Sequence, residues 1–198
     1  MPFAPVYDCR LYYEVRGQHI PILFVHPPLL SGACFIRQQE SLSDEFQVIT
    51  FDVRGHGKSE PSAKPVTYPL IVEDTLALMD FLGIEKAYLC GYSAGGAVVL
   101  EAMLTRPERF YGGILISAMP EVSDLWLALR IGAAVKFSAS RWDKLFASLM
   151  TGGNADSLQS FKRMYRDAAR SDKDNVRQYF RYSLEYNCTS ALKYVRPP

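Results

Sequence analysis

Residues 86–97 of the chain read KAYLCGYSAGGA. The residues before Gly91 predict a short buried strand, and residues 93–104 predict a helix that ends before Pro107. The G-x-S-x-G motif at 91–95 therefore lies at a sharp turn between a strand and a helix. Such a turn strains its central residue and brings chain segments close together, so the positions two before and two after need minimal side chains. Gly91 and Gly95 meet that need.

This turn gives Ser93 a chemical interpretation. A serine exposed at such a turn can attack an acyl carbon, and the Ala94 N–H at the start of the helix faces the oxyanion that then develops. The motif therefore predicts Ser93 as the catalytic nucleophile and Ala94 as an oxyanion donor. The alternative is a tight structural turn with an incidental serine.

Outward from the motif, strands alternate with helices over residues 1–120. We predict one or two antiparallel edge strands within residues 6–15 and further strands at 22–25, 46–51, 86–90 and 113–117, with helices at 34–42, 69–82 and 93–104. Alternation at this spacing predicts an α/β fold with a mostly parallel sheet flanked by helices. Residues 121–192 lack a convincing strand, and we expect a helical cap broken near residues 152–154 and 171–172 into about four helices.

Composition bounds the partners. The chain has 198 residues, 48% of them hydrophobic, which predicts a single domain with a real core. A formal net charge of +1 gives no electrostatic reason for nucleic acid or a membrane as partner, so we expect a small-molecule substrate.

The N-terminal residues lack the pattern of a secretory signal, which predicts a cytoplasmic protein. Four scattered cysteines and three dispersed histidines predict neither a disulfide framework nor a metal site, and we expect no cofactor.

Three further stretches carry a family resemblance. Residues 12–17 (YYEVRG), 24–26 (FVH) and 52–59 (DVRGHGKS) resemble, respectively, the second-strand opening, the third strand with its oxyanion loop, and the turn after the fourth strand of the α/β-hydrolase fold family. With the motif around Ser93, the resemblance covers essentially the whole chain. It implies the serine-nucleophile branch, esterase-like or lipase-like, and acyl-enzyme chemistry.

Two departures from the family pattern stand out. The family's oxyanion loop reads His-Gly-x, whereas this chain has His26-Pro27-Pro28, and proline has no N–H to donate. The second oxyanion donor must therefore come from Leu29 or beyond, or be absent, and Leu29 is the residue we expect. Residues 193–198 resemble the family's lead-in to strand seven, so we expect strands seven and eight, with the triad acid and histidine, to lie outside residues 1–198, which alone would be inactive.

Several residues are weaker candidates for the missing roles. His26 could act as a substitute base, although its usual role in this fold is structural, and His56 is expected to be structural too. Glu121 or Asp124 could supply the acid, since some members of the family carry a carboxylate just after strand six. Asp52 is expected to cap local N–H groups in its turn.

An apolar pocket between cap and sheet is the expected ligand site. Its candidate lining residues, each of which could instead be ordinary packing, are His26, Pro28, Tyr92, Trp126, Phe137 and Phe146.

The resemblance and the motif together predict a serine hydrolase for a small to medium apolar ester or related acyl substrate. The alternatives are a non-catalytic ligand-binding or signalling module on the same fold, and a carbon–carbon bond hydrolase or perhydrolase. A sheet that ended at the sixth strand would leave an apolar edge, so we expect residues 1–198 alone to aggregate or to form a homodimer.

Overall fold

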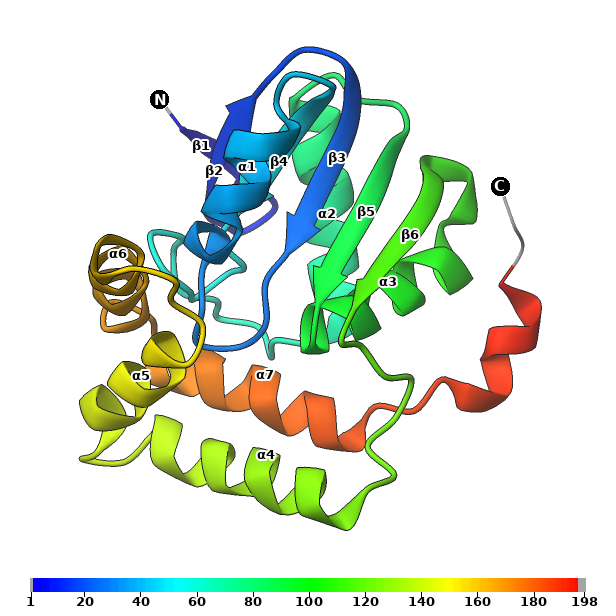
Figure 1. Cartoon of the computed structure of the whole chain (residues 1–198). Helices are drawn as coiled ribbons and strands as arrows, with labels where there is room; N and C mark the ends of the chain where they lie inside the picture. Colours follow the sequence, from blue (N-terminus) through cyan, green and yellow to red (C-terminus); the bar gives the residue numbers. More distant parts are fainter. Residues whose placement is uncertain (1, 196–198) are drawn as a thin grey trace.

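A computed structural model describes residues 2–195. Its centre is a six-stranded sheet in the order β1-β2-β4-β3-β5-β6 (Figure 1). The strands are β1 (Phe3–Val6), β2 (Cys9–Arg16), β3 (Ile20–Val25), β4 (Phe46–Phe51), β5 (Ala87–Tyr92) and β6 (Phe110–Ile116).

Strand pairing confirms the predicted mostly parallel sheet. β1 pairs with β2 and β2 with β4 in antiparallel fashion, and the other neighbours, β3 with β4, β3 with β5 and β5 with β6, are parallel. Parallel neighbours need crossover connections, and these are the helices that the alternating sequence pattern predicted. Each predicted strand is present, although β6 begins three residues before the predicted Gly113.

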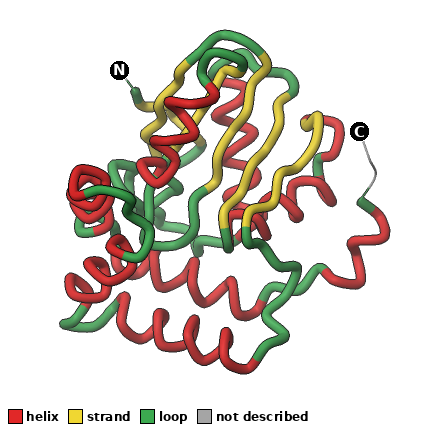
Figure 2. The backbone as a smooth tube through the Cα atoms, in the orientation of Figure 1, coloured by secondary structure: helices red, strands yellow, loops and turns green. Residues whose placement is uncertain are grey.

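Helices cover both faces of the sheet (Figure 2). Ile22 and Phe24 of β3 pack in one cluster with Leu42 of α1 (Ile36–Leu42), whereas Leu23 and Val25 belong to the cluster beneath α2 (Tyr68–Phe81) and α3 (Ala94–Thr105). Alternate side chains of one strand thus face opposite helical layers, which is why its sequence is continuously apolar.

Beyond β6 the chain forms a helical layer across the carboxyl ends of the parallel strands (Figure 1). It contains α4 (Leu125–Ser138), α5 (Asp143–Gly152), α6 (Leu158–Ala168) and α7 (Lys173–Glu185), followed by a 3-10 helix at Thr189–Tyr194. The predicted breaks fall where α5 ends and just before α7 begins. Of the expected lead-in at 193–198, residues 193 and 194 belong to that 3-10 helix, and 196–198 lie outside the described residues.

The turn after β4 fastens this layer to the sheet. Arg54 is completely buried, and its Nε and Nη2 donate to the two carboxylate oxygens of Asp74 on α2, each at 2.6 Å. At the start of α7, Asn175 Oδ1 accepts from the Ser62 N–H at 2.8 Å, and the Asp172 N–H donates to the Gly55 carbonyl at 2.8 Å. Arg54 thus anchors the turn to α2, and the partly buried contacts of Ser62 and Gly55 with the start of α7 join the turn to the cap.

Strand β6 forms one edge of the sheet among the described residues. Its residues Ile114, Leu115 and Ile116 are 42%, 47% and 37% exposed. No helix within residues 2–195 is long and apolar enough to cross a membrane.

Candidate active site

Ser93 occupies the turn between β5 and α3. Its backbone has φ 54° and ψ −121°, a left-handed region that residues with a side chain rarely adopt. The Ser93 N–H donates to the Ile116 carbonyl at 2.8 Å, which anchors the turn to the end of β6. Strain fixed in this way by its surroundings is typical of functional positions.

The glycines on either side permit this geometry. A Cβ on Gly91 would collide with the backbone of Gly95, and a Cβ on Gly95 would collide with the Val25 carbonyl on β3. The sequence argument that both positions need minimal side chains is therefore confirmed by the packing.

The start of α3 leaves hydrogen-bonding groups free beside Ser93. The Ser93 side chain makes no capping hydrogen bond to the helix. Ala94 is the first residue of α3, and an N–H in the first turn has no acceptor within its own helix. A hydroxyl and an N–H donor therefore lie side by side at the positive end of a helix dipole.

The loop after β3 runs beside this turn. Pro27 and Pro28 line the same cavity as Ser93, and Leu29 follows them with φ 70°. The Leu29 side chain is buried and packs among the cap helices with Ala134 and Phe180. The Leu29 N–H is the first that the loop offers after the prolines, and its role as an oxyanion donor stays a prediction.

His26 lies beneath this loop. We expected it to line the cavity, but it does not. Its Nε2 accepts a hydrogen bond from the Val53 N–H at 2.8 Å, so Nδ1 carries the proton and donates to the Pro27 carbonyl at 2.8 Å. Burial lowers the pKa of His26 to about 3. Both ring nitrogens are thus occupied, which excludes His26 as the substitute base.

His56 is also a buried, neutral side chain. Burial lowers its pKa to about 4, and its Nδ1 lies 3.0 Å from the Arg54 carbonyl oxygen. Its ring packs near those of His26 and Tyr179, with centroids 5.4 and 5.6 Å away. The third histidine, His19, is exposed in the turn before β3. None of the three lines the cavity.

The candidate carboxylates separate by position. Asp52 is buried and accepts from the Lys58 N–H of its own turn at 2.9 Å, which confirms the predicted local cap, and it also accepts from the Gly32 N–H of the loop after β3 at 2.8 Å. Asp124 caps α4 by accepting from the Leu127 N–H at 2.8 Å. Glu121 alone of the three lines the cavity, where it accepts a hydrogen bond from Asn187 Nδ2.

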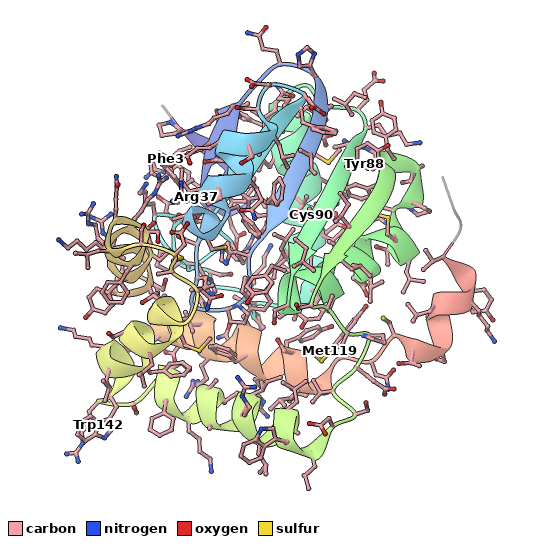
Figure 3. All side chains as sticks on the ribbon, in the orientation of Figure 1. Phe3, Arg37, Tyr88, Cys90, Met119 and Trp142 are labelled. Atoms are coloured by element: carbon pink, nitrogen blue, oxygen red, sulfur yellow. The ribbon has the colours of Figure 1, made fainter. Side chains whose placement is uncertain are left out.

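A cavity of about 430 Å³ lies between the sheet and the cap. Ser93 and Ala94 line it from the sheet, and α4 and α7 contribute Ile131 and Phe180. Met119, labelled in Figure 3, lines it from the segment after β6. The lining is mainly apolar with a few polar groups, which is the usual character of a site for small organic molecules.

The predicted pocket residues divide into two groups. Pro28, Tyr92 and Phe146 line the cavity, whereas Trp126 and Phe137 do not. Trp126 is 69% exposed, and the ring of Phe137 stacks on Phe146 at a centroid distance of 6.3 Å, one ring away from the cavity. Phe137 follows Arg130 by seven residues and so lies on nearly the same side of α4, but it comes after Ala134, the last residue of this helix that lines the cavity.

Several polar residues of the cavity were not predicted, among them Asn154 and Arg130. Asn154 follows α5, and its Oδ1 accepts from the Tyr92 hydroxyl at 3.0 Å. Arg130 lies on α4 between apolar positions three before and one after it that also face the cavity. Its place on an otherwise apolar helical stripe is the sequence signal that could have identified it.

Within residues 2–195, no three histidine, cysteine, aspartate or glutamate side chains gather as a metal ion would require. The four cysteines are free, and Cys9, Cys90 and Cys188 are buried. A site without metal or cofactor stays a prediction.

Known proteins resemble this chain in sequence over part of their length. RutD of Azorhizobium caulinodans, named for a carbamate hydrolase, is 36% identical over 110 residues, covering 55% of this chain and 41% of the relative. The 3-oxoadipate enol-lactonase 1 of Acinetobacter baylyi is 29% identical over 142 residues, covering 71% and 48%. The chain thus spans about half the length of the curated relatives it matches.

Solved structures share the architecture. A hydrolase from Pseudomonas aeruginosa PA01 superposes with a TM-score of 0.84 at 18% identity, covering 99% of this chain and 77% of that one. The enol-lactonase from Burkholderia xenovorans LB400 gives 0.80 at 21% identity, covering 94% and 74%. The sequence profile of the alpha/beta hydrolase fold matches residues 20–194. With this strand order and this turn at Ser93, the chain belongs to the α/β-hydrolase fold family.

Proposed function

We propose that the whole protein is a serine hydrolase that cleaves a small to medium apolar ester or related acyl substrate. The observation that carries the proposal is the strained Ser93, with φ 54° and ψ −121°, at the floor of a mainly apolar cavity of about 430 Å³. The names of the two sequence relatives, a carbamate hydrolase and an enol-lactonase, both denote hydrolysis at an acyl carbon.

The proposed reaction proceeds through an acyl-enzyme. Ser93 Oγ forms a bond to the acyl carbon while its proton passes to a base, and the oxyanion receives the Ala94 N–H at the start of α3. The bond to the leaving group then breaks, and the leaving group takes that proton. Water attacks the acyl-enzyme in the second half, which restores Ser93 and releases the acid. The base is not one of the histidines at 19, 26 and 56, since none of them lines the cavity.

Covalent labelling tests this assignment directly. A fluorophosphonate is expected to add one adduct to the whole protein, at Ser93, as located by peptide mass spectrometry. Ser93→Ala should lose the adduct. Ser117→Ala is the matched control, because Ser117 lines the same cavity without a place in the turn, and it should keep the adduct. An unlabelled wild-type protein, or labelling that survives Ser93→Ala, would refute the proposal.

The second candidate is a ligand-binding module without turnover. It is favoured by the loop at Pro27 and Pro28, where two consecutive residues lack the N–H that an oxyanion needs. This candidate predicts saturable ligand binding that survives Ser93→Ala, together with no ester hydrolysis from pH 5 to 10. A carbon–carbon bond hydrolase or perhydrolase would use the same serine and would be distinguished only by its products.

A further inference from the structure

Helix α4 turns one stripe of side chains toward the cavity. Leu127, Arg130, Ile131 and Ala134 all line it, and their spacing of three and four residues is that of one helix face. Three of the four are apolar, as is typical of a face that covers an apolar cavity. Arg130 is the exception, and an apolar ligand alone would give no reason for a charge at this position.

The guanidinium of Arg130 has no protein partner within residues 2–195. It takes part in none of the ion pairs or side-chain hydrogen bonds formed there. The acidic residue of the cavity, Glu121, is instead bonded to Asn187. Among the cavity's lining residues Arg130 is the sole lysine or arginine.

Lys136 shows the contrast on the same helix. It lies on another face of α4, in a surface groove that it shares with Arg177, Arg181 and Glu185 of α7. The side chains of Lys136 and Arg130 are both exposed, but only Arg130 borders the mainly apolar cavity, to which it adds a single positive charge. A guanidinium that the described residues leave unpaired at this position favours a ligand that carries an anionic group.

We propose that Arg130 binds a carboxylate of the ligand, so that the substrate is an ester, lactone or related acyl compound with one carboxylate away from the bond that reacts. The substrate part of this inference rests on the proposed function. A guanidinium presents paired N–H donors that match the two oxygens of a carboxylate. One arginine balances one negative charge, and Glu121 on the same cavity disfavours a second, which selects a monocarboxylate over a phosphate dianion.

The size of the effect follows from exposure. Arg130 is exposed, so solvent screens its interaction, and we expect about a tenfold contribution to affinity. The same exposure means that substitution should leave folding intact, which thermal melting of each variant will verify.

The test compares two esters that differ in one charge. Monomethyl glutarate and dimethyl glutarate are titrated separately by calorimetry into the Ser93→Ala form of the whole protein, in which neither should be hydrolysed. We expect the monoester to bind about tenfold more tightly than the diester at low salt, with the difference shrinking as salt rises.

Three substitutions in that background assign the difference to one residue. Arg130→Met should remove the preference for the monoester, so that the two esters bind with equal affinity. Arg130→Lys should keep most of the preference, because the charge is retained. Lys136→Met is the matched control from the same helix, and it should keep the full preference.

Equal affinities for the two esters, no measurable binding of either at millimolar concentration, or a preference that survives Arg130→Met would each overturn the inference. Its failure is separable from that of the proposed function. Labelling of Ser93 without charge discrimination would leave a serine hydrolase with no carboxylate site. Discrimination that depends on Arg130, without labelling, would leave a carboxylate-binding module.

Discussion

His26 and Val53 are joined by a hydrogen bond in which the Val53 N–H donates to the imidazole Nε2 at 2.8 Å. The bond ties the end of β3 to the turn after β4 and fixes the tautomer, since Nδ1 must then donate to the Pro27 carbonyl. Tyr179 of α7 adds a third contact by donating its hydroxyl to the His26 carbonyl at 3.1 Å. His26 is therefore a junction between the sheet, the oxyanion loop and the cap.

We predict that His26→Ala destabilises the protein. The substitution leaves the buried Val53 N–H without an acceptor, and such a loss costs about 1–3 kcal/mol of the free energy of unfolding. Urea denaturation followed by circular dichroism measures the change. If His26→Ala left stability unchanged while it abolished hydrolysis, the imidazole would be acting in the chemistry and the structural role would be wrong.

Arg54→Met should lower the free energy of unfolding by more than His26→Ala does. Arg54 and Asp74 are both buried, and removal of the guanidinium leaves the Asp74 carboxylate without its bidentate partner, at a cost of about 3–5 kcal/mol. The double variant Arg54→Met/Asp74→Leu should recover part of that loss, because it removes the unpaired buried group. Urea denaturation of the single and double variants gives their free energies of unfolding, and comparison of these values in a double-mutant cycle measures the interaction between the two residues.

Arg10 and Glu60 provide the matched control for this pair. Their side chains make a similarly short contact of 2.6 Å, but they are 64% and 40% exposed. Exposed pairs contribute little to stability, so Arg10→Met should leave the urea midpoint almost unchanged. Equal effects of Arg10→Met and Arg54→Met would contradict the argument from burial.

The glycines that flank the Ser93 turn give a prediction with an internal control. Gly95→Ala puts a Cβ against the Val25 carbonyl, so it should cost at least about 2 kcal/mol and prevent labelling of Ser93. Gly132→Ala on α4 has open space around the new Cβ, and in a helix interior it should raise stability by about 0.5–1 kcal/mol. Thermal melts and fluorophosphonate labelling of both variants provide the comparison, and a Gly95→Ala protein that folds and reacts normally would contradict it.

Local patterns explain why so much of the fold could be predicted. The strand before Gly91, the helix after Ser93 and the hydrogen bond from the Lys58 N–H to Asp52 each join residues close together in sequence, so composition and spacing reveal them. The six strands and four cap helices follow from the same kind of periodicity.

Long-range contacts could not be predicted in this way. Arg54 and Asp74 are 20 residues apart, and Arg163 reaches Glu14 at 2.7 Å across 149 residues. No periodic signal connects such positions. From sequence alone, a charged residue such as Arg54 cannot be distinguished from an exposed one, and only the packing shows that it is buried.

The cap helices show a second limit of prediction from sequence. Trp126 and Phe137 were expected at the pocket because large apolar residues favour buried places, yet Trp126 is 69% and Phe137 46% exposed. Which face of α4 points inward depends on how the helix packs on α7, which composition alone does not reveal. The inward stripe, once seen, identified Arg130 rather than the tryptophan.

The last prediction concerns acidity. Burial lowers the pKa of His56 to about 4 and that of His26 to about 3, from an ordinary value of 6.5. Between about pH 6 and 4.5 each imidazole is therefore protonated in the unfolded chain and neutral in the folded protein. Unfolding takes up these protons, so the stability contributed by the two histidines is complete above pH 6.5 and is lost as the pH falls.

Asp52 opposes this trend. Burial raises its pKa to about 7 from 3.8, so the folded protein holds a proton over the same range that the unfolded chain has released. Acidification therefore favours the folded state through Asp52 and the unfolded state through the two histidines. Across that pH range unfolding therefore takes up two protons at the histidines and releases one at Asp52. The net uptake of about one proton lowers the free energy of unfolding by about 1.4 kcal/mol for each pH unit of acidification.

Two variants should move this slope in opposite directions. His56→Leu should reduce the dependence of the unfolding free energy on pH by about 1.4 kcal/mol per unit between pH 6 and 4.5, whatever it does to stability at pH 7. Asp52→Asn should increase the dependence by a similar amount, because the opposing group is lost. Urea denaturation at four pH values measures the slopes, and parallel lines for both variants and the unaltered protein would show that neither His56 nor Asp52 changes its proton affinity on folding.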